Sequence, residues 1–201
     1  MKSIREYRKP EYDVNPVFLN RWSPRAMSGE GISEEELLSL FEAARWAPSA
    51  NNNQPWRFVF ARRDTPHWQP FLDLLVDLNR AWAFRAAALV VVVSKTTFDH
   101  NGKFSRTHSY DAGAAWENLA LQGSLKGLVV HGMQGFDYER ADELLKVPDV
   151  YQVEAMAAIG RPGTLESLPE KYREREFPSD RKKLSEIVME GFFRNGEFVN
   201  G

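Results

Sequence analysis

The sequence contains no cysteine among its 201 residues. This absence excludes disulfide scaffolds, thiolate nucleophiles, iron–sulfur clusters and cysteine-ligated zinc. Long apolar runs are also missing: the longest, Ala86 to Val93, has 8 residues, and a membrane-spanning helix needs about 20. The segment from Met1 to Arg8 is charged and has no apolar stretch before a small-residue cleavage site, so we expect no secretory signal. These absences favour a cytoplasmic protein.

An excess of charge of one sign is missing as well. The 26 basic and 28 acidic residues give a net charge of −2, so no basic field for nucleic acid is expected. Aromatic residues at 12% and apolar residues at 43% exclude a disordered chain. We therefore expect a globular protein that binds neither nucleic acid nor membranes.

Helical and extended patterns alternate along the chain, which predicts an α/β or α+β fold in a single domain, residues 1–201. The clearest helix follows a capping box of Ser33 and Glu36 and ends before Pro48. Leu89–Val93 is apolar without alternation, which predicts a central strand buried on both faces. The other expected helices are Pro66 to Leu78, Tyr110–Lys126 and Tyr138–Leu145, and the other expected strands are Arg57–Ala61, Val129–Val130 and Val153–Ile159.

The two ends of the chain differ from this alternating region. Residues 1–20 have few periodic apolar positions and are expected to form an irregular N-terminal arm. Residues 170–201 are expected to form a C-terminal extension, highly charged from Glu170 to Lys183 and then amphipathic for one turn.

Most catalytic signatures are absent from the sequence. It has no Walker phosphate loop, no dinucleotide fingerprint of glycines and no serine nucleophile elbow. The histidines at 67, 100, 108 and 131 include no pair one helical turn apart, so we expect no metal site. We interpret all four as surface or loop residues.

Anion binding is the first chemistry that the residues support. Arg21, Ser23 and Arg25 place two guanidinium groups and a hydroxyl within five residues, which suits a phosphate. A solvated basic turn is the alternative, and for a short Arg-rich stretch taken alone it is the commoner outcome.

Three further segments together suggest a pocket for a flat heteroaromatic ligand. The amide-rich loop from Pro48 to Trp56 can both donate and accept hydrogen bonds, although a plain turn has the same composition. Asn79 and Trp82 are neighbours on one helix surface, and the glycines of Gly132 to Gly135 permit close backbone approach. With the phosphate clamp, these features are what flavin mononucleotide (FMN) would require.

The order of these segments resembles the nitroreductase family of FMN-dependent oxidoreductases. The resemblance rests on four motifs between Arg21 and Val188: R-x-S-x-R at Arg21, P-S-x-x-N-x-Q-P-W at Pro48, D-x-G-A-A-x-x-N-L at Asp111 and I-G-x-P at Ile159. The stretch P-S-A-N-N-N-Q-P-W is the most specific of them.

The resemblance implies an α+β fold with a central, mainly antiparallel sheet flanked by helices. It also implies a homodimer with two FMN sites at the subunit interface. NADH or NADPH would reduce N5 of the flavin and leave, and a nitroaromatic, a quinone or a related electron-poor small molecule would then take the electrons in a ping-pong reaction. The flavin would carry the chemistry, so no catalytic side chain is expected.

The same resemblance assigns the cofactor-binding residues. The phosphate and ribityl end would be held by Arg21, Ser23, Arg25, Arg181 and Lys183. The partner subunit would bring Pro48, Ser49, Ala50 and Asn52 toward the flavin. Asn79 would bond the pyrimidine edge, beside Trp82, while Gly132, Met133, Gln134 and Gly135 would pass near the ring.

Two positions depart from the family pattern. Relatives often have a lysine where this chain has Trp82, so a cation that would favour anionic reduced flavin is missing. An indole there would either wall the flavin or pack in the core. Many relatives have a glutamate in place of Gln134. Two other classes remain as alternatives: a flavin-binding protein for storage or redox sensing without turnover, and an oligomeric module without cofactor.

Overall fold

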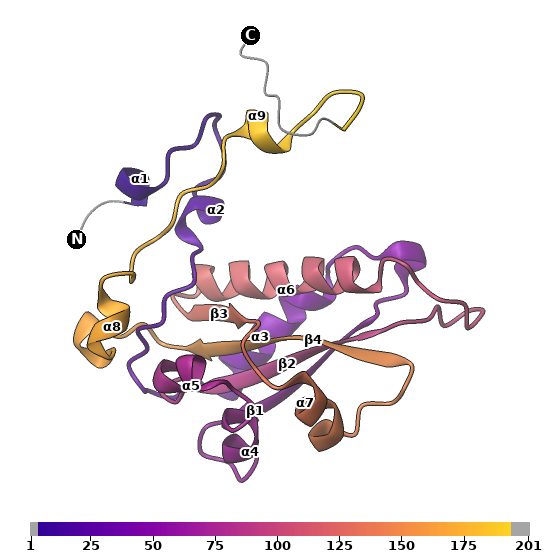
Figure 1. The fold of residues 1–201 in the computed structure, drawn as a ribbon, viewed down its shortest axis with the longest axis horizontal. Coiled ribbons are helices and arrows are strands. Elements are labelled where there is room, and N and C mark those ends of the chain that lie inside the picture. The colour runs from indigo at the N-terminus through magenta and orange to yellow at the C-terminus, as the bar shows by residue number, and fades with distance from the viewer. Residues whose placement is uncertain (1–3, 194–201) are drawn as a thin grey trace.

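The computed structural model describes residues 4–193, and its core is a four-stranded sheet in the order β1-β2-β4-β3. The strands are β1 (Trp56–Arg62), β2 (Ala88–Lys95), β3 (Val129–Met133) and β4 (Tyr151–Gly160). Every neighbouring pair is antiparallel. The sheet with helices on both faces confirms the predicted α+β class, and β2 lies in the interior of the sheet as expected (Figure 1).

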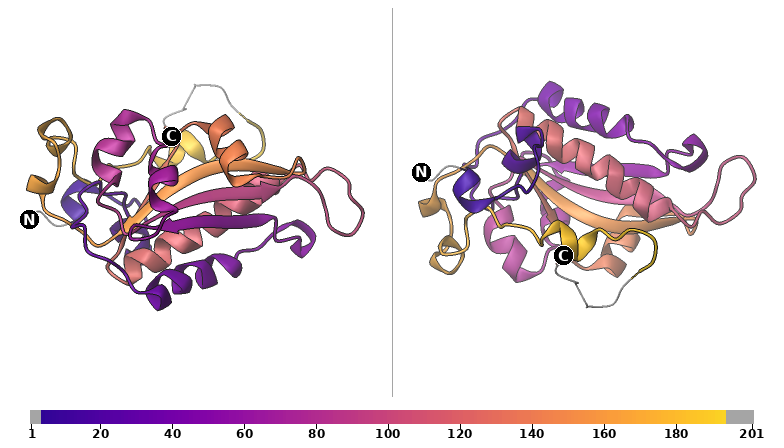
Figure 2. Two further views of the ribbon diagram at one scale, coloured as in Figure 1. Left: turned by 90° about the horizontal axis from the view of Figure 1, so that it is seen from below. Right: turned by 90° about the horizontal axis from the view of Figure 1, so that it is seen from above.

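Strand β2 divides its side chains between two apolar cores, which explains its unbroken run of valines. Val91 and Val93 join the core under α4 (Trp68–Leu72), α5 (Asp77–Ala83) and α7 (Tyr138–Leu145). Val90 and Val92 join the core under α3 (Glu34–Arg45) and α6 (His108–Leu125). Figure 2 shows these two groups of helices on opposite faces of the sheet.

Helices α3 and α6 form the layer that the sequence predicted best. Ser33 and Glu36 make the expected capping box at the start of α3. Helix α6 approaches β3 closely, because a Cβ on Gly123 would lie 2.5 Å from Val130 Cγ2. Leu38 of α3 and Leu125 of α6 are exposed.

The single helix expected from Pro66 to Leu78 is wrong, because the structure has two helices there, α4 and α5. The residues between α4 and α5 form backbone hydrogen bonds with the segment that follows β3. Val76 N donates to Gly135 O at 3.2 Å, and Asp137 N donates to Leu74 O at 2.9 Å. These bonds across the chain replace those of a continuous helix, and Leu75 is buried whereas Leu78 is exposed.

The two ends of the chain run beside each other, away from the sheet (Figure 1). The arm is less irregular than expected, since it contains α1 (Ile4–Tyr7) and α2 (Pro16–Asn20). The C-terminal extension contains α8 (Glu170–Arg173) and α9 (Leu184–Ile187), after the turn η2 (Leu165–Ser167). Residues 1–3 of the predicted arm and 194–201 of the predicted extension lie outside the described residues. Between residues 4 and 193, no helix has the length and apolar character to cross a membrane.

Candidate functional site

The segment after α2 carries the first group of predicted site residues. Arg21 Nε lies 3.2 Å from Glu117 Oε1 on α6, and Arg21 Nη1 lies 3.5 Å from Ser23 Oγ. Arg8 from the N-terminal arm donates from Nη1 to the carbonyl oxygens of Leu19 and Arg21, at 2.6 and 2.7 Å. The same guanidinium donates from Nε to Ser179 O of the C-terminal extension at 3.0 Å. One buried arginine therefore joins three segments of the chain.

Arg8, Arg21 and Arg181 form a cluster of positive charge at this junction. The pKa of Arg8 is lowered, first by burial and then by the charges of Arg181 and Arg21, with Asp180 opposing them. Like charges at short range destabilise one another, so this cluster suits an anion. Lys183 lies at the start of α9 and, with Arg8 and Arg181, lines a groove of about 890 Å³ between the two chain ends.

Sequence reasoning missed Arg8. It lies beside the other arm cations Arg5 and Lys9, outside the R-x-S-x-R motif, and the nearest predicted site residue in the sequence is Arg21. Only the pairing of the two chain ends, which no local pattern encodes, makes it part of the site.

Arg25 has different neighbours from Arg21. Its guanidinium lies 3.6 Å from Glu176 Oε2, while the backbone N–H groups of Arg25 and Ala26 donate to Glu176 Oε1 at 2.6 and 2.8 Å. The Glu176 side chain is only 3% exposed. The two arginines of the motif are therefore tied to different parts of the molecule, Arg21 to α6 and Arg25 to the C-terminal extension.

His131 of β3 forms a hydrogen bond with the segment that contains Arg21 and Arg25. Its Nδ1 lies 2.9 Å from Pro24 O, and burial lowers its pKa to about 4, with the charge of Arg25 acting in the same direction. The ring is therefore neutral at pH 7 and donates its Nδ1 proton to Pro24 O. The surface or loop interpretation of the histidines is wrong for His131 and also for His108, which is 6% exposed and begins α6.

Trp82 packs against His131 inside the core. The ring centroids lie 4.5 Å apart, and Trp82 is 1% exposed. Of the two alternatives for this residue, the geometry is that of core packing. Any influence of Trp82 on a ligand at the surface would pass through His131.

Asn79 and Gly135 meet at the end of β3. Asn79 Nδ2 donates to Gly135 O at 3.0 Å, and a Cβ on Gly135 would lie 2.8 Å from the same Nδ2. This glycine therefore allows the contact with Asn79. The amide oxygen of Asn79 and the second hydrogen on its Nδ2 remain for a ligand.

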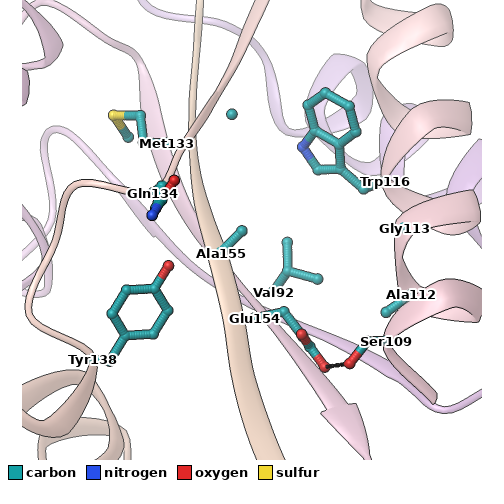
Figure 3. Close-up of a pocket in the computed structure, with 11 residues that line it drawn as sticks. Val92, Ser109, Ala112, Gly113, Trp116, Met133, Gln134, Tyr138, Glu154 and Ala155 are labelled. Carbon is teal, nitrogen blue, oxygen red and sulfur yellow. Dashed lines mark hydrogen bonds between the residues drawn. The ribbon is translucent and has the colours of Figure 1, made fainter. Parts of the chain in front are cut away.

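Strand β3 ends at Met133, and beyond this point the edge of β4 is not covered by it. A pocket of about 560 Å³ opens there (Figure 3). Met133 and Gln134 lie on one side of it and Trp116 of α6 on the other (Figure 3), with Gly132 against the indole. A Cβ on Gly132 would lie 2.8 Å from Trp116 Cζ2, so only glycine admits the indole here. The indole Nε1 of Trp116 is buried without a hydrogen-bond partner. The remaining lining residues are Val92, Ser109, Ala112, Gly113, Tyr138, Glu154 and Ala155.

The predicted loop Pro48 to Asn52 lies elsewhere. It forms the turn η1 (Ala50–Asn52), and Ala50 N donates to Asp111 Oδ2 at 3.1 Å, near the start of α6. Figure 1 shows this turn beyond one end of α6, while α2 lies near the other end. A single chain thus does not bring Ser49 and Ala50 together with Arg21.

Comparison with known proteins gives a consistent result. The model of the nitroreductase family matches residues 19–67 and 63–161. An NADH dehydrogenase of Thermus thermophilus is 28% identical over 213 residues, covering 90% of this chain and 97% of that protein.

Solved structures include close matches over nearly the whole chain. A crystal structure described as an oxidoreductase containing FMN has a TM-score of 0.92 and 46% identity, over 98% of this chain and 100% of that one. A nitroreductase family protein of Clostridium difficile has a TM-score of 0.69 at 20% identity, over 90% of this chain and 100% of that one, which supports the fold alone.

Proposed function

The chain belongs to the nitroreductase family of oxidoreductases, and on that premise we propose that it binds FMN and oxidises NADH or NADPH. Nitroaromatics, quinones or related electron-poor molecules would be the acceptors in a ping-pong reaction. The observation that carries the proposal is the cluster of Arg8, Arg21 and Arg181, whose mutual repulsion a bound phosphate would relieve. The similar oxidoreductase of known structure contains FMN, which supports the same cofactor here.

The phosphate end of FMN would lie against the arginine cluster. Arg21 and Arg181 would donate to the phosphate oxygens, with Ser23 and Lys183 nearby. Arg8 donates three hydrogen bonds to backbone carbonyl oxygens, so its role would be to position Arg21. Arg25 lies near His131 rather than in the cluster and would face the ribityl chain or the ring.

The isoalloxazine would lie along the end of β3. Asn79 would present its amide oxygen to a ring N–H, and Gly132 to Gly135 would allow the ring to approach the backbone. When bound, FMN supplies hydride and electron transfer at N5, and the protein supplies orientation and exclusion of water. Trp116 Nε1 is a buried donor without a partner in the wall of the neighbouring pocket, which supports a ligand at this end of β3. Trp82 would act on the ring only indirectly.

A homodimer would complete the site. The loop containing Pro48, Ser49, Ala50 and Asn52 does not reach Arg21 in its own chain, so the partner would supply it. Tyr110 on α6 is 80% exposed beside this loop and is a candidate for the interface. We also propose that each chain folds as one domain and that the protein is cytoplasmic.

Anaerobic titration of the purified protein with NADH and then NADPH tests the proposal. Bleaching of a bound flavin spectrum, followed by recovery on addition of a quinone, is the expected result. A flavin that stays oxidised would support a storage or sensing protein, and a colourless protein that cannot take up FMN would contradict the proposal.

A further inference from the structure

Glu154 places a carboxylate in the wall of the pocket beside β3. It stands on β4 beyond the last residue pair with β3, where the edge of β4 is open. Figure 3 shows Glu154 at one end of the pocket and Trp116 at the other, with the hydroxyl group of Tyr138 directed into the space between them. Apart from Ser109, the lining near Glu154 is apolar, namely Val92, Ala112 and Ala155.

Neutral groups hold this carboxylate in place. Ser94 donates to Glu154 Oε1, and Ser109 donates to the same oxygen at 2.7 Å. Because the single proton of Ser94 is used on Glu154, the contact of 2.7 Å between Ser94 Oγ and His108 Nδ1 needs the proton on the histidine. A neutral ring protonated at Nδ1 satisfies this bond. The network therefore orients Glu154 without requiring a positive charge.

The charged neighbours of Glu154 bear on which ligand its carboxylate would favour. In the described part of the chain no lysine or arginine forms an ion pair with Glu154, and the basic group it meets is His108 Nδ1 at 3.3 Å. Its side chain is 17% exposed, and that exposure is toward the pocket. A carboxylate in largely apolar surroundings favours a ligand that carries a positive charge or strong hydrogen-bond donors.

We propose that this pocket selects planar aromatic acceptors that bear a cationic group, and that Glu154 determines the selection. The aromatic part of the ligand would lie between Gln134 and Trp116, and its charged group would meet the free oxygen of Glu154. The acceptor role rests on the proposed function, because Gly132 to Gln134 are shared by the pocket and the proposed flavin site. Anionic aromatic acceptors are disfavoured by the same carboxylate.

Three nitroarenes with one ring and different charges test this selection: 4-nitrobenzamidine, 4-nitrobenzamide and 4-nitrobenzoate. With the purified holoenzyme, kcat/KM should be at least about tenfold higher for the amidine than for the benzoate, as expected for a charge-assisted pair. In Glu154→Gln, the value for the amidine should fall about tenfold or more, while that for the neutral amide stays within about twofold. Glutamine keeps an oxygen that can accept from Ser94 and Ser109.

Calorimetric binding of benzamidine, which cannot be reduced, gives a readout independent of turnover. Its dissociation constant should rise about tenfold in Glu154→Gln and remain unchanged in Glu139→Gln, a matched loss of charge on the exposed face of α7. Equal kcat/KM values for the three nitroarenes in the wild type would overturn the proposal, even if Glu154→Gln fails to fold. So would equal benzamidine binding by the two variants. A protein without flavin would contradict the proposed function, and benzamidine binding would still decide the selectivity of the pocket.

Discussion

Arg8 Nη1 donates a hydrogen bond of 2.7 Å to the carbonyl oxygen of Arg21, across the gap between the N-terminal arm and the start of the sheet domain. The bond holds the backbone of Arg21 in place while leaving the Arg21 side chain directed toward Glu117 and Ser23. Arg8 can in this way determine the geometry of Arg21, which we propose to bind the phosphate.

Arg8→Met should weaken FMN binding about tenfold or more, because the loss of hydrogen bonds to the Leu19 and Arg21 carbonyls frees the phosphate-binding segment. Riboflavin, which lacks the phosphate, should lose much less affinity. Fluorescence titration with both flavins measures the difference. Arg5→Met removes the same charge from an exposed position of α1 and is the control. Equal losses for FMN and riboflavin would contradict a role at the phosphate.

The different surroundings of Arg21 and Arg25 lead to a second prediction. Arg21→Ala should cost about 1.5–3 kcal/mol of FMN binding and remove most of the preference for FMN over riboflavin. Arg25→Ala should weaken both flavins, because Arg25 lies near His131 and away from the cluster. Flavin dissociation constants for the two variants decide this. The assignment fails if Arg25→Ala alone abolishes the preference.

His131 predicts a pH dependence of stability. Its pKa is lowered from 6.5 to about 4 in the folded state, so the unfolded chain binds more protons between these values. The stability that this residue contributes is complete above pH 6.5 and is lost as the pH falls toward 4, by at most about 3 kcal/mol. Urea unfolding at pH 7, 5.5 and 4 measures this loss.

Two variants isolate the contribution of His131 from those of the carboxylates. His131→Gln keeps a donor for Pro24 O but does not titrate, so its free energy of unfolding should fall less between pH 7 and 4 than that of the wild type. His100→Gln, at an exposed position, should behave as the wild type does. If the free energy of unfolding falls with pH by the same amount in all three proteins, His131 is not buried in its neutral form.

Two glycines of α6 should respond in opposite ways to alanine. In Gly123→Ala the new Cβ would lie 2.5 Å from Val130 Cγ2, and overpacking of this kind costs about 1–3 kcal/mol. Gly113 has no heavy atom within 4 Å of such a Cβ, so Gly113→Ala should stabilise the helix by up to about 1 kcal/mol. Thermal unfolding compares them, and a stabilised Gly123→Ala would show that α6 lies farther from β3.

The proposed dimer gives the last prediction. Light scattering should find twice the mass of one chain at micromolar concentration, with an interface of roughly 2,000 Å² or more. Tyr110→Lys should weaken the dimer and lower FMN occupancy together, because the partner would supply part of the site. A stable monomer with one FMN per chain would contradict this prediction.

Local patterns were sufficient for the layers of the fold. The capping box at Ser33, the unbroken run of valines in β2 and the long helix α6 are encoded within short windows of sequence, and the structure confirms them. The break between α4 and α5 is different. It depends on hydrogen bonds to the segment after β3, which lies about 60 residues away in the chain and leaves no local signal.

The candidate site was predictable in part for the same reason. The R-x-S-x-R motif identified Arg21, but Arg8 and Glu176 join it only through the pairing of the chain ends. Trp82 could not be assigned from its helical position, since the face toward the ligand and the face toward the core are adjacent there. At 1% exposure it lies in the core, where a lysine would place an ammonium group in apolar surroundings.

Glu176 accepts hydrogen bonds from the backbone of Arg25 and Ala26, and Arg8 reaches Ser179, which is 171 residues away. A chain still being synthesised on the ribosome has neither acceptor until Glu176 and Ser179 have emerged. The sheet can form earlier, because β4 ends at Gly160. The proposed phosphate site is therefore complete only after these residues have been added, and a chain truncated before Glu176 would keep the sheet but lose the contacts of Arg25, Ala26 and Arg8 with the C-terminal extension.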